Sequence, residues 1–393
     1  MDNVLLDTFC KKGSDLDEFC ALIASMDART RFVRLKSGDL QLLSIVSDSD
    51  THIYCHRLMP DTEQSFDSIK TLRKLDKAKL RAKGVSDELM REIVSTGLLF
   101  YNGQSIMLTS PNIMSGLWAF GVKGSFLDTP CLARDMVIAR QFSTDKECTL
   151  VTREAASTKN AFAILGGRFN GLPQSIILDI IDVIEDTGEM GQRICREWQI
   201  NNFTSSVHVE FPQKGEELRT IYGIADELIP GILISSSDTG DSSVRVQGTW
   251  RWGDSVSLHG EVKRKHIGKV TAEDMLEHIQ AEIFGKYPVF LEKLCELTCK
   301  PITEATLTRT QNKKAVEEAL KQAFKEVGII KAVGIKNEIA LYDKMSRCID
   351  GAMNYTAYDI ALMVLQLPEK AKNLTDSAAE LLQVAIGRVP NIL

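Results

Sequence analysis

Two neighbouring runs of alternating apolar and polar residues constrain the fold of this chain more than any other feature. The apolar and polar positions of the first run are Val244, Val246, Gly248, Trp250 and Trp252 against Arg245, Gln247, Thr249 and Arg251. Successive side chains of a strand point to opposite faces, so this alternation is typical of a strand with one buried face. A second run follows over 256–263, after turn-forming residues. The pattern predicts a β-hairpin.

The length of the turn decides which residues of the two strands share a face. A two-residue loop would place Trp252 beside Ser255 and mix apolar with polar positions, whereas a three-residue loop, Gly253 to Ser255, places Trp252 beside Val256. We therefore predict the three-residue loop. On this register the polar face of the hairpin 244–265 carries Arg245, Gln247, Thr249, Arg251, Ser257, His259, Glu261 and Lys263, followed by Arg264, Lys265 and His266.

This polar face has two interpretations. It is either an ordinary solvated sheet face, which antiparallel sheets commonly have, or a groove for a phosphate backbone. The second interpretation fits because cations beside hydroxyl and amide donors are the groups that bind phosphates in proteins.

The segments that flank the hairpin predict the rest of a central α+β core. Ile229 to Ile234 is a short apolar run suited to a buried strand, and a capping-box pattern at Thr271 begins an amphipathic helix. Between strand and hairpin, 235–243 is rich in Ser, Asp and Gly and predicts a loop. An alternative for this loop is a backbone nest for an anion, or a cation held by Asp238 and Asp241.

The most basic stretch of the chain runs from Ser65 to Lys83. Its apolar positions recur at helical spacing, and so do four of its cations, which would form one basic stripe: Lys70, Lys74, Lys77 and Arg81. The stretch therefore predicts a helix. It is either a solvated surface helix or a helix that contacts phosphates.

Length and composition predict an ordinary globular protein with more than one structural region. The 393 residues carry a formal net charge of −6, which argues against a wholly basic surface but leaves room for a local basic patch. We expect an N-terminal α+β region over 1–150, a central α+β core over 151–300 and a helical region over 301–393. Nine scattered cysteines, no export signal and no membrane span predict a cytoplasmic protein with reduced thiols.

Signatures of catalysis and of metal or cofactor binding are absent from the sequence. It contains no Walker loop, dinucleotide fingerprint, nucleophile elbow or HExxH motif. His52 and His56 would lie on one face of a strand, too far apart to chelate zinc easily, and no CxxC pair accompanies them. We therefore expect no metal, no cofactor and a non-catalytic protein. An active site assembled from distant residues would escape this reasoning.

Four short motifs resemble a phage- and plasmid-borne family known mainly as a domain of unknown function. They are Pro230 to Val246, Lys263 to Gly268, Gly166-Gly167-Arg168 and Asn354 to Asp359, and the resemblance covers roughly residues 150 to 390. The chain departs from the family pattern at Ser236, where Asn is common, and at Ile267, where Thr is common. The resemblance implies a role near replication or recombination. The hairpin-plus-helix layout is also similar, by analogy, to phage single-strand-annealing recombinases.

Three hypotheses about function follow. The first is a phage-type protein that binds single-stranded nucleic acid as a homo-oligomer in the cytoplasm of a bacterial host, for annealing in recombination or replication. Its expected contacts are Lys70, Lys74, Lys77, Arg81, Arg245, Arg251, Lys263 and Lys265. The second is a phage structural or host-interaction protein whose partner is another protein. The third is a nuclease or nucleotide-processing enzyme that uses Asp238, Asp241 and similar groups with a divalent ion.

Overall fold

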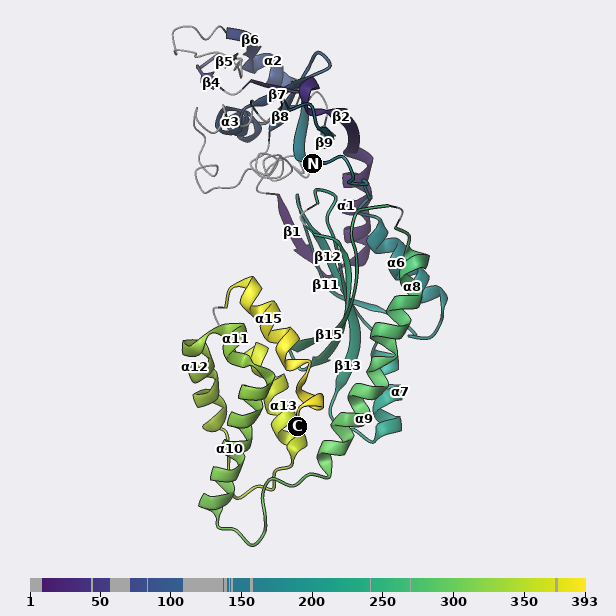
Figure 1. Cartoon of the computed structure of the whole chain (residues 1–393), viewed down its shortest axis with the longest axis vertical. Coiled ribbons are helices and arrows are strands. Elements are labelled where there is room, and N and C mark those ends of the chain that lie inside the picture. The colour runs from purple at the N-terminus through teal and green to yellow at the C-terminus, as the bar shows by residue number, and fades with distance from the viewer. Residues whose placement is uncertain are drawn as a thin grey trace.

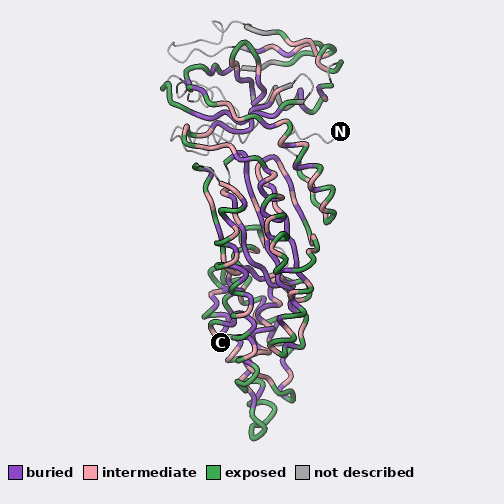
Figure 2. Tube along the Cα trace, turned by 90° about the vertical axis from the view of Figure 1, so that its right-hand side faces the viewer, coloured by how far each residue is buried: buried purple, intermediate pink, exposed green. Residues whose placement is uncertain are grey.

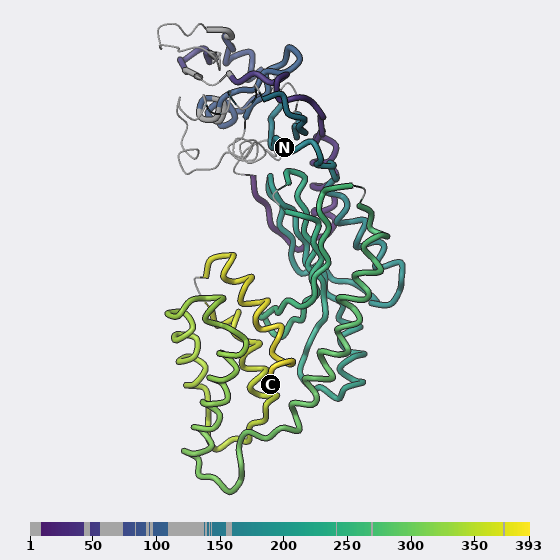
Figure 3. The backbone as a smooth tube through the Cα atoms, viewed as in Figure 1, coloured from purple at the N-terminus to yellow at the C-terminus, as the bar shows by residue number. Residues whose placement is uncertain are grey.

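The computed structural model describes residues 9–56, 71–108 and 137–393, apart from positions 44, 83, 138–139, 141, 143, 156–157, 241, 269 and 372–373. An N-terminal α+β region, a central sheet and a group of C-terminal helices follow one another along the long axis of the molecule (Figures 1 and 3). The predicted α+β class, with antiparallel sheet and a C-terminal helical region, is confirmed.

The central sheet has six antiparallel strands in the order β1-β11-β12-β13-β14-β15. Their bounds are β1 Cys10–Gly13, β11 Ile194–Asn201, β12 Ser205–Glu210, β13 Leu228–Ser236, β14 Val244–Trp252 and β15 Ser255–Arg264. Helices cover one face of this sheet (Figure 1): α6 Ile176–Asp186, α7 Pro212–Tyr222, α8 Ala272–Ile279 and α9 Lys286–Thr298. A π-helical turn, η4 Gln280–Phe284, joins α8 to α9.

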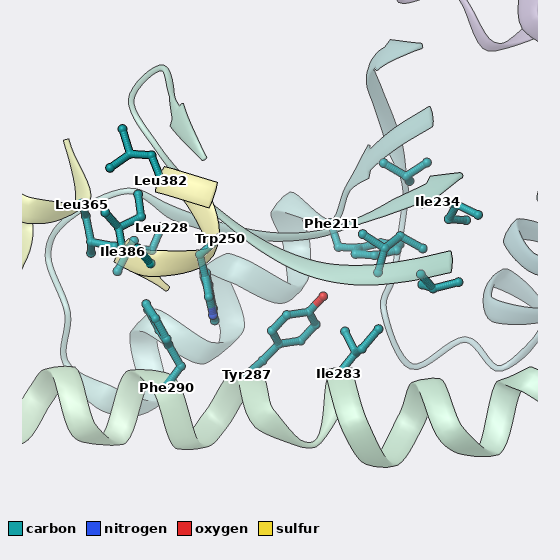
Figure 4. Close-up of a cluster of buried hydrophobic side chains, with 14 of the residues drawn as sticks. Phe211, Leu228, Ile234, Trp250, Ile283, Tyr287, Phe290, Leu365, Leu382 and Ile386 are labelled. Carbon is teal, nitrogen blue, oxygen red and sulfur yellow. The ribbon is translucent and has the colours of Figure 1, made fainter. Parts of the chain in front are cut away.

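The predicted apolar face of β14 packs against α9. Val244 and Val246 are fully buried, and Trp250 is 1% exposed. The Trp250 ring stacks on Phe290 and meets Tyr287 edge-on, with centroid distances of 5.3 Å in both pairs (Figure 4). The alternation of the sequence thus identified the core side of this strand correctly.

We expect Trp250→Ala to lower the free energy of unfolding by about 3–5 kcal/mol, because it empties the centre of this aromatic cluster. Trp252 at the partly buried end of the same strand is the matched control, and its replacement by alanine should cost clearly less. Urea unfolding followed by circular dichroism measures both losses. Equal losses for the two variants would contradict the assignment of the core.

The predicted three-residue loop of the hairpin is wrong. Trp252 pairs with Ser255, so the turn is the two residues Gly253-Asp254, with Gly253 in the left-handed region at φ 56°. This register places Val256 and Leu258 on the face opposite Trp250, and His259 on the same face as Trp250. A bulge at Gly260, with φ 64°, then returns the later part of β15 to the expected alternation.

The C-terminal helices explain why that register is stable. Their bounds are α10 Arg309–Val327, α11 Ile329–Val333, α12 Ile335–Ser346, α13 Ala357–Leu365, α14 Leu367–Lys370, α15 Asp376–Ile386 and η5 Val389–Asn391. Helix α15 packs against β15 so closely that a Cβ atom on Gly387 would come within 2.1 Å of the Leu258 carbonyl oxygen. The second face of the sheet is therefore not solvated here, and Leu258 is buried on it.

The N-terminal region contains a second sheet and a small third one. The second sheet has the order β2-β9-β10-β8-β7-β3, with bounds β2 Thr30–Lys36, β9 Glu147–Ala155, β10 Thr158–Gly166, β8 Gln104–Leu108, β7 Leu98–Tyr101 and β3 Gln41–Leu43. The third consists of β4 Ile45–Asp48, β5 His52–His56 and β6 Thr71–Asp76. The helices of this region whose bounds lie within the described residues include α1 Leu16–Arg29, η1 Ser37–Asp39, α2 Lys77–Ala82 and α3 Asp87–Thr96. The predicted boundary at residue 150 falls inside β9.

Strand β9 contacts α1 and contains the buried residues Leu150 to Arg153, and Figure 2 shows buried residues in both the N-terminal and the central part of the molecule. Helix α1 links the two, since it leads from β1 of the central sheet into β2. The N-terminal and central regions are therefore connected by two crossings of the chain, one through α1 and one after β10.

The predicted helix over Ser65 to Lys83 is wrong over residues 71–76, and the described residues form a helix only further along the stretch. Residues 71–76 form strand β6, and only Lys77–Ala82 form a helix. Lys70 lies outside the described residues. Lys74 is therefore on a strand, while Lys77 and Arg81 are on a short helix, so the three do not form one helical stripe. The strand pairing of β6 with β5 overrides the helical spacing of its charges.

Candidate anion-binding site

A pocket of about 450 Å³ lies where the end of β15 and the loop before β14, both of the central sheet, meet the end of β10 of the second sheet. Three segments that are distant in sequence form its wall. They are the end of β10 with the residues after it (Leu165, Gly166, Arg168 and Phe169), the β13–β14 loop (Gly240, Ser242 and Ser243) and the end of β15 with the residues after it (Lys263, Lys265, His266 and Ile267). We call it the junction pocket. Each of these segments belongs to one of the motifs that carry the family resemblance, so motifs far apart in the chain meet at one place.

The junction pocket is lined by cations. Arg168, Lys263 and Lys265 are all exposed there, and none of them forms an ion pair with a described residue. No carboxylate lines the pocket among the residues that the structure describes, and Asp241 lies outside them. A concave surface with uncompensated positive charge attracts anions, because low-dielectric walls focus the field.

An aromatic pair forms part of the wall. The His266 ring stacks on Phe169 with centroids 5.3 Å apart, and its Nε2 lies 3.0 Å from the Ser242 carbonyl oxygen. Burial lowers the pKa of His266, so the ring is neutral near pH 7 and donates its Nε2 proton to that carbonyl. Its Nδ1 is then an acceptor, and it has no hydrogen-bond partner among the described residues. An aromatic surface beside cations suits a stacked base.

Two hydrogen bonds donated by Asn170, one from its backbone and one from its side chain, fix the pocket wall. The Asn170 amide donates to the His266 carbonyl oxygen at 2.8 Å, and the Asn170 side chain donates to the Gly268 carbonyl oxygen at 2.8 Å. Gly240 has φ 80°, and a Cβ atom there would come within 2.9 Å of Leu165. The loop therefore needs glycine at this point to pass over the end of β10.

A buried ion pair lies at the base of the same loop. The Arg153 guanidinium binds both carboxylate oxygens of Asp238, at 2.8 and 2.9 Å, and both side chains are fully buried. Arg153 also donates to the Asn202 side chain at 2.9 Å and to Thr30 at 3.3 Å, and its guanidinium lies 4.3 Å from the Phe162 ring centroid. Asp238 thus joins the β13–β14 loop to β9 of the N-terminal region and is not exposed for binding a cation.

The structure brings two of the predicted contact residues, Lys263 and Lys265, together in the junction pocket, whereas the other described ones do not line it. Arg245 is beside Lys263 on the sheet, but its guanidinium pairs with Glu261 and, at 2.7 Å, with Glu380 of α15. Arg251 lies six residues further along β14, about 20 Å away, and pairs with Glu210 at 2.7 Å. These two arginines are therefore compensated.

The three described cations of the predicted basic stripe do not line the junction pocket. Lys77 pairs with Asp48, and Arg81 pairs with Asp87 at 2.8 Å. Lys74 lies over the Tyr54 ring, 5.6 Å from its centroid. Asp48 and Asp87, the partners of Lys77 and Arg81, lie on β4 and α3. The charge pattern of the basic stretch alone therefore did not reveal these ion pairs.

Arg168 and Phe169 are residues of the pocket that the sequence reasoning did not select. The signal that pointed to them was the Gly-Gly-Arg motif at 166–168, which was noted only for the resemblance. Nothing in a single sequence indicates that this motif lies beside Lys263, because the two meet only through the packing of two sheets.

The polar cluster around Arg251 contains a buried histidine. His208 is 3% exposed, and its Nε2 lies 2.9 Å from the Thr249 hydroxyl. Burial, together with the charges of Arg196 and Arg251, lowers the pKa of His208 to about 3. Its ring is therefore neutral in the folded protein at any pH in the physiological range.

This histidine predicts a loss of stability in mild acid. Because its pKa is lower in the folded than in the unfolded chain, the unfolded chain takes up the proton first as the pH falls below 6.5. The wild type should lose about 2 kcal/mol between pH 7 and pH 5 through this group alone. Guanidinium unfolding of His208→Gln at both pH values should show a correspondingly smaller loss. An identical loss in both proteins would contradict the prediction.

Two further properties concern the described residues as a whole. They contain no group of three or more His, Cys, Asp or Glu side chains placed to hold a metal ion, so nothing there favours the metal-dependent nuclease hypothesis. None of their helices has the length and apolar character needed to cross a bilayer. In comparisons with known proteins, this chain matches no protein-family model, no curated protein and no solved structure.

Proposed function

We propose that this protein binds single-stranded nucleic acid, with the phosphate backbone held at the junction pocket. The observation that carries the proposal is the meeting of Arg168, Lys263 and Lys265 in one concave site with no carboxylate in its described wall. Arginine and lysine side chains of this kind provide the greater part of nonspecific affinity for nucleic acids.

The aromatic wall supports a single-stranded rather than a double-stranded ligand. Phe169 and His266 lie beside the cations, and an unpaired base can stack on such a surface whereas the bases of a duplex are already stacked on one another. A pocket of about 450 Å³ is also too small to accept a duplex and suits one or two nucleotides of a flexible strand. Little preference for sequence is expected, because every base has a face that stacks.

Fluorescence anisotropy with a labelled single-stranded oligonucleotide of mixed sequence tests this proposal. We expect binding at low salt, with a duplex of the same sequence binding more weakly. Phe169→Ala should reduce the affinity for the single strand more than that for the duplex, because it removes only the stacking surface. Equal affinities for both ligands would contradict the assignment to single strands.

A role in annealing, a phage origin and a homo-oligomer remain part of this proposal and rest on the sequence resemblance. The protein-interaction hypothesis is the alternative. The observation in its favour is the pair Ile335 and Ile339, which are 61% and 55% exposed one helical turn apart on α12. Light scattering after size exclusion, with and without oligonucleotide, separates a homo-oligomer from a monomer.

A further inference from the structure

Strand β2 is an edge strand of the second sheet, beside β9 (Figure 1), and it is basic. The stretch from residue 29 to residue 36 contains four cations and no carboxylate: Arg29, Arg31, Arg34 and Lys36. Among the described residues, only Lys36 of these four has an ion-pair partner, which is Asp145 at 3.2 Å. The other three cations therefore leave uncompensated positive charge along this edge.

Aromatic contacts join β2 to the junction pocket. The rings of Phe32 and Phe169 have centroids 6.3 Å apart, and Phe169 in turn stacks on His266 at 5.3 Å. The Phe32 ring also lies against the backbone of Gly171, where a Cβ atom would come within 2.2 Å of it. His266 is buried, whereas Phe169 and Phe32 are only half-buried. We call the three rings the aromatic row, because their contacts lead from the pocket wall to the middle of β2.

Arg34 is the cation that continues this row. It is exposed, and it lies on the same face of the sheet as Phe32, because residues two apart on a strand point the same way and are about 7 Å apart. The paired strand β9 places Thr149 opposite Arg34, and its carboxylate Glu147 lies opposite Lys36. Arg34 therefore has no carboxylate as its cross-strand neighbour.

The opposite end of the same face is closed. Thr30, two residues before Phe32, is buried, and its hydroxyl accepts a hydrogen bond from Arg153 at 3.3 Å. Arg31 points to the other face of β2, and its Nη1 donates to the backbone carbonyl oxygens of Ala28 and Thr30 at 3.0 and 2.8 Å. The accessible path from the aromatic row consequently leads toward Arg34.

We propose that a single strand bound at the junction pocket continues over the aromatic row onto β2, with one base against Phe32 and a neighbouring phosphate at Arg34. This inference rests on the proposed function and adds that the substrate is a strand of several nucleotides, since the pocket alone suits one or two. Aromatic faces beside cations are the arrangement by which proteins bind single strands with little sequence preference.

Charge reversal at Arg34 tests the path in the full-length protein. Oligothymidylate serves as the probe because it does not pair with itself, and strands of about twelve nucleotides are compared with a dinucleotide by competition in the anisotropy assay. Arg34→Glu should weaken binding of the long strand about tenfold at low salt. Binding of the dinucleotide, which occupies only the pocket, should change by less than about twofold. Arg347→Glu, the same change at an exposed position of the C-terminal helices, is the matched control and should alter neither affinity.

A second variant tests the stacking surface. Phe32→Leu keeps an apolar side chain against Gly171 but removes the aromatic face, so it should weaken binding of the long strand about fivefold or more. Thermal unfolding checks that each variant keeps the fold of the wild type.

The outcomes separate this inference from the proposed function. If Arg34→Glu binds the long strand as tightly as Arg347→Glu does, or loses as much affinity for the dinucleotide as for the long strand, the path over β2 is wrong. The proposed function then still stands, provided that Lys263→Ala with Lys265→Ala weakens binding. If the wild type binds no strand at low salt, both fail.

Discussion

Replacing Asp238 by asparagine is expected to lower the free energy of unfolding by about 3–5 kcal/mol, a loss as large as the one expected for Trp250→Ala. The substitution keeps the shape of the side chain but leaves the fully buried Arg153 guanidinium without its counter-charge. Desolvating a charge is costly, and Asp238 is the only carboxylate among the described residues that pairs with Arg153. Equilibrium unfolding in guanidinium chloride measures the loss.

Two comparisons make this prediction specific. The double variant Arg153→Met with Asp238→Leu should lose much less than Asp238→Asn, because no charge is left unpaired. Asp145→Asn removes one partner of an exposed pair with Lys36, whose side chains are 61% and 58% exposed for Lys36 and Asp145, and should cost below about 1 kcal/mol. A loss of this small size for Asp238→Asn would show that the buried pair does not hold the two regions together.

Reversing the three charges of the junction pocket is expected to reduce affinity for single-stranded nucleic acid by at least about a hundredfold at low salt. The triple variant is Arg168→Glu, Lys263→Glu and Lys265→Glu, and all three positions are exposed, so the fold should not change. Each reversal removes one attractive contact with a phosphate and introduces a repulsive one.

The matched control has the same change in net charge at exposed lysines of the C-terminal helices. The three substitutions are Lys321→Glu and Lys325→Glu on α10 and Lys336→Glu on α12, and none of these residues lines the junction pocket. The control should bind within a few-fold of the wild type in the anisotropy assay. If it loses as much affinity as the pocket variant, the effect comes from total charge, and the pocket has no special role.

The strands of the hairpin could be predicted from the sequence, but their register could not. The alternation around Trp250 identified a strand and its buried face, because a two-residue period is a local property. The register was chosen on the assumption that the other face meets solvent. Helix α15, which comes much later in the chain, covers that face, so burying Leu258 there is favourable.

The residues of the candidate site could likewise be predicted only in part from the sequence. Lys263 and Lys265 stand in a run of like charge at the end of a strand, which made them candidates. Arg245 and Arg251 belonged to the same predicted face, yet carboxylates from other elements, Glu380 and Glu210, compensate them. Such pairs form between residues that only the tertiary structure brings together. Arg168 could not be predicted for the same reason, because only the tertiary structure places it beside Lys263.

The measurement that tests the central claim most directly is the salt dependence of oligonucleotide binding by the wild type and by Lys263→Ala with Lys265→Ala. Binding to phosphates releases counterions, so the logarithm of the wild-type affinity should fall steeply and linearly with the logarithm of the salt concentration. The double variant should bind more weakly, with a slope flatter by about one unit for each lost contact. Absence of wild-type binding at low salt, or an unchanged slope in the variant, would contradict binding of nucleic acid at the junction pocket.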